Sequence, residues 1–199
     1  MVSRFVDLVR PSEFPSTPWK NGAGTTVELA TGPLLGGTPL WRFSIATLAD
    51  ETTRFSSFPG MDRVFTVIGD AGVHLAFAAE ILDARPGNPV AFSGADEPVC
   101  TPQAETRAFN VMVDSTRATA DVTAHDLATG SFITDPREVT LVFVRTGRAS
   151  AASIDATASQ CLLVHGSSVR VSGSGAVLLA RVDLKDGSMH GHRREHNRR

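Results

Sequence analysis

The sequence predicts an all-β protein. Short runs of apolar and β-branched residues recur along the chain, and clusters of Gly and Pro separate them at close spacing. No stretch carries the 3.6-residue apolar repeat of a long amphipathic helix. Short strands with turns at this spacing are typical of a β-sandwich or a barrel, and not of alternating strands and helices.

Each predicted strand is an apolar run bounded by turn-forming residues. In chain order the strands are Leu40–Leu48, Arg63–Ile68, Val73–Ala78, Val90–Phe92, Phe109–Val113, Ala118–Val122, Glu138–Arg145, Gln160–His165 and Ala176–Leu184. Paired Gly, Pro and Asn residues mark the turns, as at Gly69–Gly72 and Pro86–Pro89. Two segments, Asp50–Arg54 and Thr123–Ala128, have the composition for one helical turn each.

Two parts of the chain are weakly alike. Val73–Ala76 follows the turn Gly69–Gly72, and Val169–Val171 follows the turn Gly166–Ser168. A strand, a tight turn and a strand that occur twice fit two stacked jelly-roll units, as in a double cupin.

We therefore expect a double-cupin unit over residues 1–185, with a first half over about 1–115 and a second over about 116–185. Beyond it, residues 186–199 are rich in Arg and His and lack apolar periodicity. Such a segment cannot build a core, so it predicts a flexible basic tail.

Composition narrows the class of protein. The chain has 199 residues, 42% of them hydrophobic, and a net charge of −2, which argues against general nucleic-acid binding. No apolar run has the length of a bilayer-spanning helix, and the first residues lack the pattern of a signal peptide. We expect a cytoplasmic protein that binds neither nucleic acid nor membrane, with Cys100 and Cys161 buried and reduced.

The segment Pro18–Glu28 holds the most informative motif. It combines Trp19, Lys20 and Asn21 with glycines at positions 22 and 24. Gly-x-Gly weakens a strand, whereas a surface linker has no need of a large aromatic residue. We expect a loop that Trp19 fixes in place and that presents Lys20, Asn21 and backbone N–H groups to a small anion.

Alternation within two strands separates an apolar face from a polar one. Arg42 and Ser44 share one face of their strand, and Asn110 and Met112 share one face of theirs. Each polar face either contacts solvent or lines the interior of a small barrel. In the second case Arg42, Ser44 and Asn110 would face a ligand.

These side chains suit recognition of a carboxylate. Arg42 and Arg63 each present a planar fork that can donate two parallel hydrogen bonds, and Asn21 and Asn110 can bind a neutral polar group. The alternatives are a surface ion pair for Arg42 and a local pair with Asp62 for Arg63. The candidate ligand-binding residues are Lys20, Asn21, Arg42, Ser44, Ser56, Phe58, Arg63 and Asn110.

Metal and catalytic motifs are missing from the sequence. A metal-binding cupin needs His-x-His, a following Glu and a further His, and only His74 follows the turn Gly69–Gly72. No Gly-x-Ser-x-Gly, Walker loop or His-Glu-x-x-His is present. We therefore expect no metal, no cofactor and no catalytic residue. For an enzyme, His74 and Glu28 are the only general bases that we place near the pocket.

Several motifs, in their order and separations, resemble the HutD/Ves family of bacterial cupin-like proteins over roughly residues 15–115. They are Trp19-Lys20-Asn21-Gly22, Gly24-Thr25-Thr26, Trp41-Arg42 with Ser44, Phe55-Ser56 with Phe58-Pro59-Gly60, Asp62-Arg63 and Phe109-Asn110-Val111-Met112. The resemblance implies a metal-free double cupin whose pocket such residues line. It also implies an accessory or regulatory role in histidine utilisation, through binding of an intermediate such as urocanate or formylglutamate. Ala23 and Ala108 stand where the family pattern has Gly and Asp.

Three functions remain open on the sequence. The leading one is a non-catalytic protein that binds a small carboxylate. The alternative is a metal-independent cupin enzyme, an isomerase or a hydrolase, that acts on a small carboxylate. The third is an oligomerisation module whose apolar strand faces form a homodimer.

Overall fold

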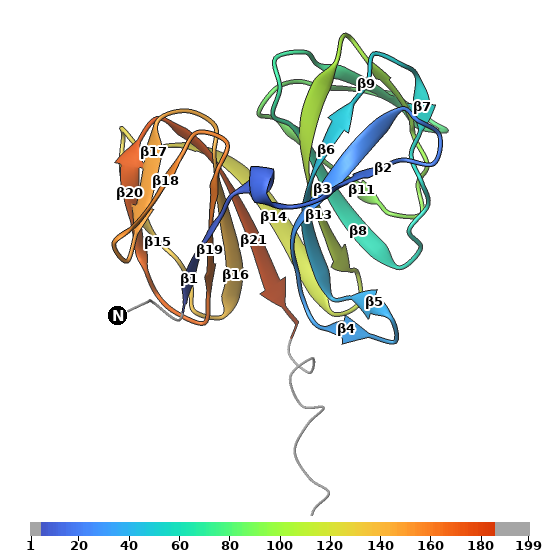
Figure 1. Ribbon diagram of the computed structural model, residues 1–199. Coiled ribbons are helices and arrows are strands. Elements are labelled where there is room, and N and C mark those ends of the chain that lie inside the picture. Colours follow the sequence, from blue (N-terminus) through green and yellow to red (C-terminus); the bar gives the residue numbers. More distant parts are fainter. Residues whose placement is uncertain (1–4, 186–199) are drawn as a thin grey trace, which may run out of the picture.

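The computed structural model describes residues 5–185 and consists almost entirely of β-strands (Figure 1). Its one helical element in this range is the short 3₁₀ helix η1 (Pro11–Glu13), which the sequence did not predict. The all-β prediction is confirmed. Residues 186–199, predicted to form a flexible tail, lie outside the described residues. Between residues 5 and 185 no helix combines the length and the apolar character that crossing a membrane requires.

The larger sheet has six strands in the order β11-β8-β13-β6-β3-β2, and all neighbouring strands pair antiparallel. Its strands are β2 (Ser16–Pro18), β3 (Gly24–Thr31), β6 (Trp41–Leu48), β8 (Met61–Val67), β11 (Pro89–Ser93) and β13 (Thr106–Asp114). Between β3 and β6 the chain forms a small hairpin of β4 (Leu34–Leu35) and β5 (Thr38–Pro39).

A second sheet has five strands in the order β1-β19-β16-β21-β14. Its strands are β1 (Val6–Val9), β14 (Ala118–Asp126), β16 (Glu138–Val144), β19 (Cys161–His165) and β21 (Ala176–Leu184). The N-terminal strand β1 pairs with β19, and the chain then passes through η1 to β2 in the six-stranded sheet (Figure 1). The predicted division of the chain into two cupin-like halves near residues 115 and 116 stays a prediction. The pairing of β1 with β19 means that the five-stranded sheet contains one strand from the predicted first half.

Two four-stranded sheets complete the fold. One has the order β10-β9-β12-β7 and the other β15-β20-β17-β18. The strands of the first are β7 (Thr53–Arg54), β9 (Val73–Ala76), β10 (Ile81–Ala84) and β12 (Val99–Pro102). The strands of the second are β15 (Phe132–Ile133), β17 (Arg148–Ala151), β18 (Ile154–Thr157) and β20 (Arg170–Ser174).

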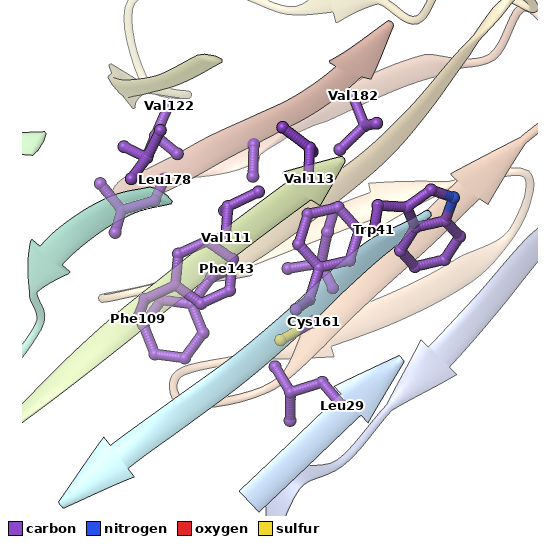
Figure 2. Close-up of a cluster of buried hydrophobic side chains, with 14 of the residues drawn as sticks. Leu29, Trp41, Phe109, Val111, Val113, Val122, Phe143, Cys161, Leu178 and Val182 are labelled. Atoms are coloured by element: carbon purple, nitrogen blue, oxygen red, sulfur yellow. The ribbon is translucent and has the colours of Figure 1, made fainter. Parts of the chain in front are cut away.

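The two large sheets pack against each other through one apolar cluster (Figure 2). Phe109 of β13 lies at its centre, with ring centroids 6.2 Å from Phe43 of β6 and 6.1 Å from Phe143 of β16. The three rings are nearly parallel, with interplanar angles of 11° and 15°. Burial of these faces removes a large apolar area from water, which is the main force that joins the sheets.

Each large sheet also packs on its other face against a four-stranded sheet. Behind the five-stranded sheet, side chains such as Leu162, Val164 and Val171 form a closed apolar cluster. Behind the six-stranded sheet, a cluster that includes Phe65 and Leu75 fills only part of the space. The remaining part holds polar side chains and a cavity, which is the candidate functional site.

Two expected helical turns are wrong. Thr53 and Arg54 form β7, which pairs with β12. The segment Thr123–Asp126 continues β14, because its pairing with β21 extends to Asp126 opposite Ala176. In both places backbone hydrogen bonds to a neighbouring strand replace the local bonds that one helical turn would offer. A single turn is unstable without packing, so pairing prevails.

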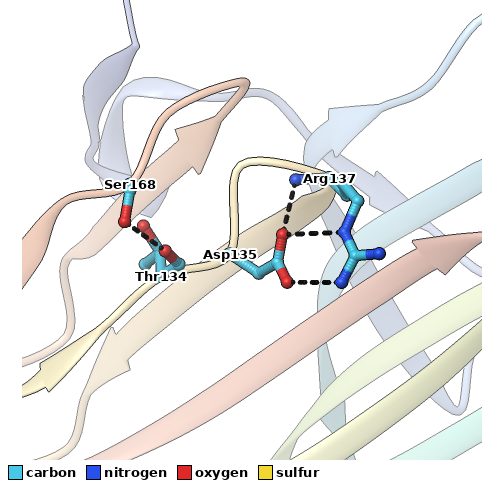
Figure 3. A network of polar contacts seen from close by, with 4 residues as sticks. All are labelled: Thr134, Asp135, Arg137 and Ser168. Carbon is cyan, nitrogen blue, oxygen red and sulfur yellow. Dashed lines mark hydrogen bonds and ion pairs between the residues drawn. The ribbon is translucent and has the colours of Figure 1, made fainter.

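A polar network fixes the turn between β15 and β16 (Figure 3). The Asp135 carboxylate accepts hydrogen bonds from the backbone N–H of Arg137, at 2.9 Å, and from its guanidinium, at 2.9 and 3.2 Å. Thr134 is joined to the loop before β20, where Ser168 Oγ donates to its carbonyl oxygen at 3.1 Å. The network orders this turn without contributing to the cavity.

Candidate ligand-binding cavity

A cavity of about 940 Å³ opens on the face of the six-stranded sheet that points away from the five-stranded sheet. Strands β2, β3, β6, β8 and β13 and the segment around Phe55 provide its walls. Every candidate residue lines it, namely Lys20, Asn21, Arg42, Ser44, Ser56, Phe58, Arg63 and Asn110. Side chains separated by up to 90 positions in the sequence thus meet on one surface, and their binding of a ligand stays a prediction.

Strand register explains this convergence. Met112 of β13 stands opposite Arg42 of β6 on one side and Arg63 of β8 on the other. One step further along, Asn110 stands opposite Ser44. Residues opposite each other in paired strands share a face of the sheet, so both rows point into the cavity. The predicted alternation of β6 and β13 is therefore confirmed.

Arg63 is a buried cation with little hydrogen bonding. Its side chain is only 7% exposed, and its Nη2 donates to Asn110 Oδ1 at 3.3 Å. Its Nε and Nη1 have no partner among the described residues. The guanidinium carbon lies 5.0 Å from the ring centroids of Phe55 and Phe92 and 5.7 Å from that of Phe58. These rings favour the cation but leave N–H donors unsatisfied.

Arg42 lies in a similar state. Its Nη2 contacts Met112 Sδ at 3.1 Å, its Nε has no partner among the described residues, and its guanidinium carbon lies 5.5 Å from the Phe58 ring centroid. A thioether is a weak acceptor, so this contact compensates poorly for lost hydration. Arg42 and Arg63 therefore share Phe58 and both carry unused donors.

Burial sets the electrostatics of the pair. It lowers the pKa of Arg63 to about 10, with a further lowering from the charge of Arg42. It also lowers the pKa of Arg42, and the charge of Glu28 partly opposes that effect. Within residues 5–185 no ion pair to either arginine is found. The expected alternatives, a surface pair for Arg42 and a pair with Asp62 for Arg63, are thus wrong.

Trp19 holds the glycine motif in place. Its Nε1 donates to Thr26 Oγ1 at 2.8 Å, and its backbone N–H donates to the carbonyl oxygen of Gly24 at 2.9 Å. Trp19 thus fixes the segment, as we expected. The segment is not a loop throughout, however, because Gly24 begins β3 and the residues before it form the turn of the β2–β3 hairpin. A side chain at Gly24 would meet the carbonyl oxygen of Thr47 and the Trp19 ring, which explains why a glycine occupies this strand position.

Asn21 and Asn110 differ in what they offer. Asn21 Nδ2 donates to Thr53 Oγ1 at 2.6 Å and its Oδ1 accepts from the backbone N–H of Ala23, so the fold already uses this amide. Asn110 uses only Oδ1, toward Arg63, and its Nδ2 makes no hydrogen bond to the described residues. Asn110 is therefore better suited than Asn21 to hydrogen-bond a neutral polar group of a ligand, whereas Asn21 stabilises the cavity wall.

Sequence reasoning missed part of the lining. Thr26 and Arg54 also line the cavity, and Phe55 supplies both lining and a ring beside Arg63. Residues 24, 26 and 28 share a face of β3, but the expectation of a loop concealed that alternation. Phe55 stands in the motif before Phe58, which was a usable signal.

His74 was wrongly placed near the pocket. It lies on β9, exposed, with Nδ1 2.6 Å from Asp83 Oδ1, and it does not line the cavity. Glu28 does line it. Across residues 5–185, no three His, Cys, Asp or Glu side chains gather as metal ligands would. Cys100 and Cys161 are buried free thiols, as expected.

The fold and the cavity together define a cupin-type all-β protein with a cationic pocket. A structure described as a cupin 2 conserved barrel domain protein from Leptotrichia buccalis superposes with a TM-score of 0.58 at 8% identity, covering 93% of this chain and 99% of that one. The chain belongs to the HutD family, whose model matches residues 11–181.

Individual relatives agree with this assignment. The structure of HutD from Pseudomonas fluorescens SBW25, in a formate condition, has a TM-score of 0.80 and 28% identity, and covers 90% of this chain and 99% of that chain. An uncharacterised 21.2 kDa protein in the hutC 3′ region of Pseudomonas putida is 36% identical over 103 residues, 48% of this chain and 50% of that protein. Protein Ves of Escherichia fergusonii is 36% identical over 86 residues, 41% of this chain and 43% of its own length. The chain thus spans about half the length of these curated relatives.

Proposed function

We propose that this protein binds a small carboxylate without converting it, and that it serves histidine utilisation in an accessory or regulatory role. The observation that carries the proposal concerns two guanidinium groups in one cavity, the buried one of Arg63 and the partly buried one of Arg42. Among the described residues neither makes an ion pair, and both have N–H donors without a partner. A buried cation without a fixed anion is costly, and an exchangeable anion removes that cost when it binds.

A carboxylate fits the donors that remain free. Two oxygens can accept parallel hydrogen bonds from one guanidinium and further bonds from the other. Asn110 Nδ2 and Ser44 Oγ stand in the next row of the sheet, where they can bind a second polar group of the ligand. The rings of Phe55 and Phe58, which line the cavity beside Arg63, provide an apolar wall for the ligand body.

Membership of the HutD family supports the link to histidine utilisation, as does the relative in the hutC 3′ region of P. putida. Urocanate and formylglutamate are the candidate ligands. We further propose that the four sheets form a double cupin, because each large sheet packs one four-stranded sheet against its outer face. Location in the cytoplasm and a homodimer stay predictions.

A ligand screen tests the proposal. Melting temperature is measured with urocanate, formylglutamate, glutamate and histidine, since a ligand that binds only the native state raises it. We expect urocanate or formylglutamate to raise it in a concentration-dependent way. If none of these compounds does so at millimolar concentration, the binding function is wrong.

The enzyme alternative is tested on the same samples. Glu28 lines the cavity and is the one general base from the sequence that the structure places there. We expect NMR spectra of each compound to stay unchanged during incubation with the protein. If the wild type converts one of the compounds and Glu28→Gln does not, the non-catalytic role is wrong and the protein is a metal-independent isomerase or hydrolase.

A further inference from the structure

Glu28 is the only acidic side chain among the described residues that line the cavity. The basic ones are Lys20, Arg42, Arg54 and Arg63. Glu28 stands opposite Ser44, which itself stands opposite Asn110, so the carboxylate belongs to the row of side chains that faces the interior.

A β-bulge supports this placement. The register of β3 against β6 shifts between Glu28 and Ala30, so Leu29 is an extra residue. Leu29 is buried in the cluster between the two large sheets, while Glu28 keeps its place on the cavity face. Bulges commonly redirect a side chain at a functional site.

The Glu28 carboxylate has no structural partner in the part of the chain that the structure describes. Among the described residues it makes no ion pair or side-chain hydrogen bond, although its charge opposes the lowering of the Arg42 pKa. Glu28 is exposed, so it retains hydration until a ligand arrives. It is therefore free to interact with a ligand that Arg42 and Arg63 hold.

Charge is thus distributed unevenly across the cavity. Strands β6 and β13 lie between β3, which carries Glu28, and β8, which carries Arg63. Three strand spacings put the two backbones roughly 14 Å apart. Side chains from both strands reach inward, which leaves room for a ligand of several bonded atoms between a negative and a positive end.

We propose, on the premise that the cavity binds a small carboxylate, that Glu28 determines its specificity. It favours ligands with one carboxylate at the arginines and an N–H donor or cation at the other end. It disfavours dicarboxylates, because the second carboxylate would face a like charge. Of the two candidate ligands it therefore favours urocanate, which has one carboxylate and an imidazole N–H, over formylglutamate, which has two carboxylates.

The test uses three probes of matched length: 4-aminobutanoate, glutarate and butanoate. Their affinities are measured by NMR titration of the wild type, of Glu28→Gln and of Glu80→Gln. Glu80 is an exposed acid outside the cavity, so its variant controls for the same change in net charge.

In the wild type we expect 4-aminobutanoate to bind about tenfold more tightly than glutarate, the scale of one charge-assisted hydrogen bond. Glu28→Gln should remove most of that preference, because it should lower the affinity for 4-aminobutanoate and raise the affinity for glutarate. The affinity for butanoate should change little. Glu80→Gln should behave as the wild type.

Two failures are distinguishable. If the probes bind but Glu28→Gln leaves their ratio unchanged, or the wild type prefers glutarate, the role of Glu28 is wrong and the carboxylate-binding function stands. If no probe binds the wild type, both the role of Glu28 and the proposed function are wrong.

Discussion

Arg63 has the environment of a core residue and the charge of a surface residue. Three phenylalanine rings surround it, and two of its nitrogens lack a partner in the described part of the chain. Stability alone would favour an apolar side chain at this position. We therefore attribute the arginine at this position to the proposed binding of a carboxylate.

Arg63→Met tests this explanation. Methionine has similar length and removes the buried charge, so we expect the free energy of unfolding of the ligand-free protein to rise by about 1–2 kcal/mol. The same variant should lose the ligand-induced rise in melting temperature. Urea denaturation and thermal melts measure the two effects. A strongly destabilised Arg63→Met would indicate a structural role through Asn110 instead.

The two buried thiols give the protein a pH dependence on the alkaline side. Burial raises the pKa of Cys100 from 9.0 to about 12, although Arg63 partly opposes the shift, and burial also raises the pKa of Cys161. The folded protein therefore holds protons that the unfolded chain releases above about pH 9. This contribution to stability is complete below pH 9 and is lost as the pH rises toward the folded pKa.

Between pH 8 and pH 10 we expect a loss of roughly 1 kcal/mol of unfolding free energy for each thiol, since one pH unit above the unfolded pKa corresponds to about 1.4 kcal/mol. A variant with both Cys100→Ala and Cys161→Ala should be less stable than the wild type at pH 8. Its unfolding free energy should, however, fall less than that of the wild type between pH 8 and pH 10. Urea denaturation at each pH measures the difference. If the wild type and the double variant lose the same unfolding free energy between pH 8 and pH 10, the thiols are not the source of the pH dependence.

At the scale of elements, local patterns predicted some strands well and missed others. The alternation in β6 and β13 placed Arg42, Ser44 and Asn110 on one face correctly, because side-chain direction in a strand follows from sequence alone. Strand β3 was missed, because Gly24 reads locally as a strand breaker. The reason for that glycine is tertiary, since the Thr47 carbonyl and the Trp19 ring approach it closely.

Details of the site were beyond the reach of the sequence for the same reason. The environment of Arg63 depends on Phe92, which arrives on β11 through pairing with β8. The availability of Asn110 and the engagement of Asn21 depend on partners across strands, Arg63 and Thr53. Residue type predicts which groups can bind an anion, whereas only the folded chain determines which ones are free.

The hairpin of β2 and β3 offers a paired test. An added Cβ at Gly24 would lie 2.4 Å from the Thr47 carbonyl oxygen, whereas at Gly22 it would meet nothing within 4 Å. Gly22 has a φ of +76°, so Gly22→Ala should lower the free energy of unfolding by about 1 kcal/mol through backbone strain alone. Gly24→Ala should lower the free energy of unfolding by about 2–3 kcal/mol, because the backbone of β6 or β3 must move to accommodate the added Cβ. Equal effects in chemical denaturation would argue against the close packing of this hairpin.

At the scale of the whole molecule, the two large sheets share one core. Phe109 stacks between Phe43 on its own side of that core and Phe143 on the other. Neither sheet can separate without exposing this cluster to water, so we expect the chain to unfold in one transition. Calorimetry should give equal calorimetric and van't Hoff enthalpies.

Phe109→Ala should lower the free energy of unfolding by about 3–5 kcal/mol and shift the whole transition. Ile81→Ala is the control, since Ile81 is 69% exposed on β10 and its truncation should have little effect. Two resolved transitions in the wild type, or a loss confined to one of them in Phe109→Ala, would show that the sheets unfold independently.

Titration calorimetry of urocanate with the wild type and with Arg42→Ala tests whether Arg42 and Arg63 form a carboxylate site. Arg42 contacts no acid in the described structure, so its removal should leave the circular dichroism spectrum unchanged. We expect the affinity to fall by about 1.5–3 kcal/mol, the range for a charge-assisted hydrogen bond. Equal affinities in the wild type and in Arg42→Ala would contradict the assignment of this cavity.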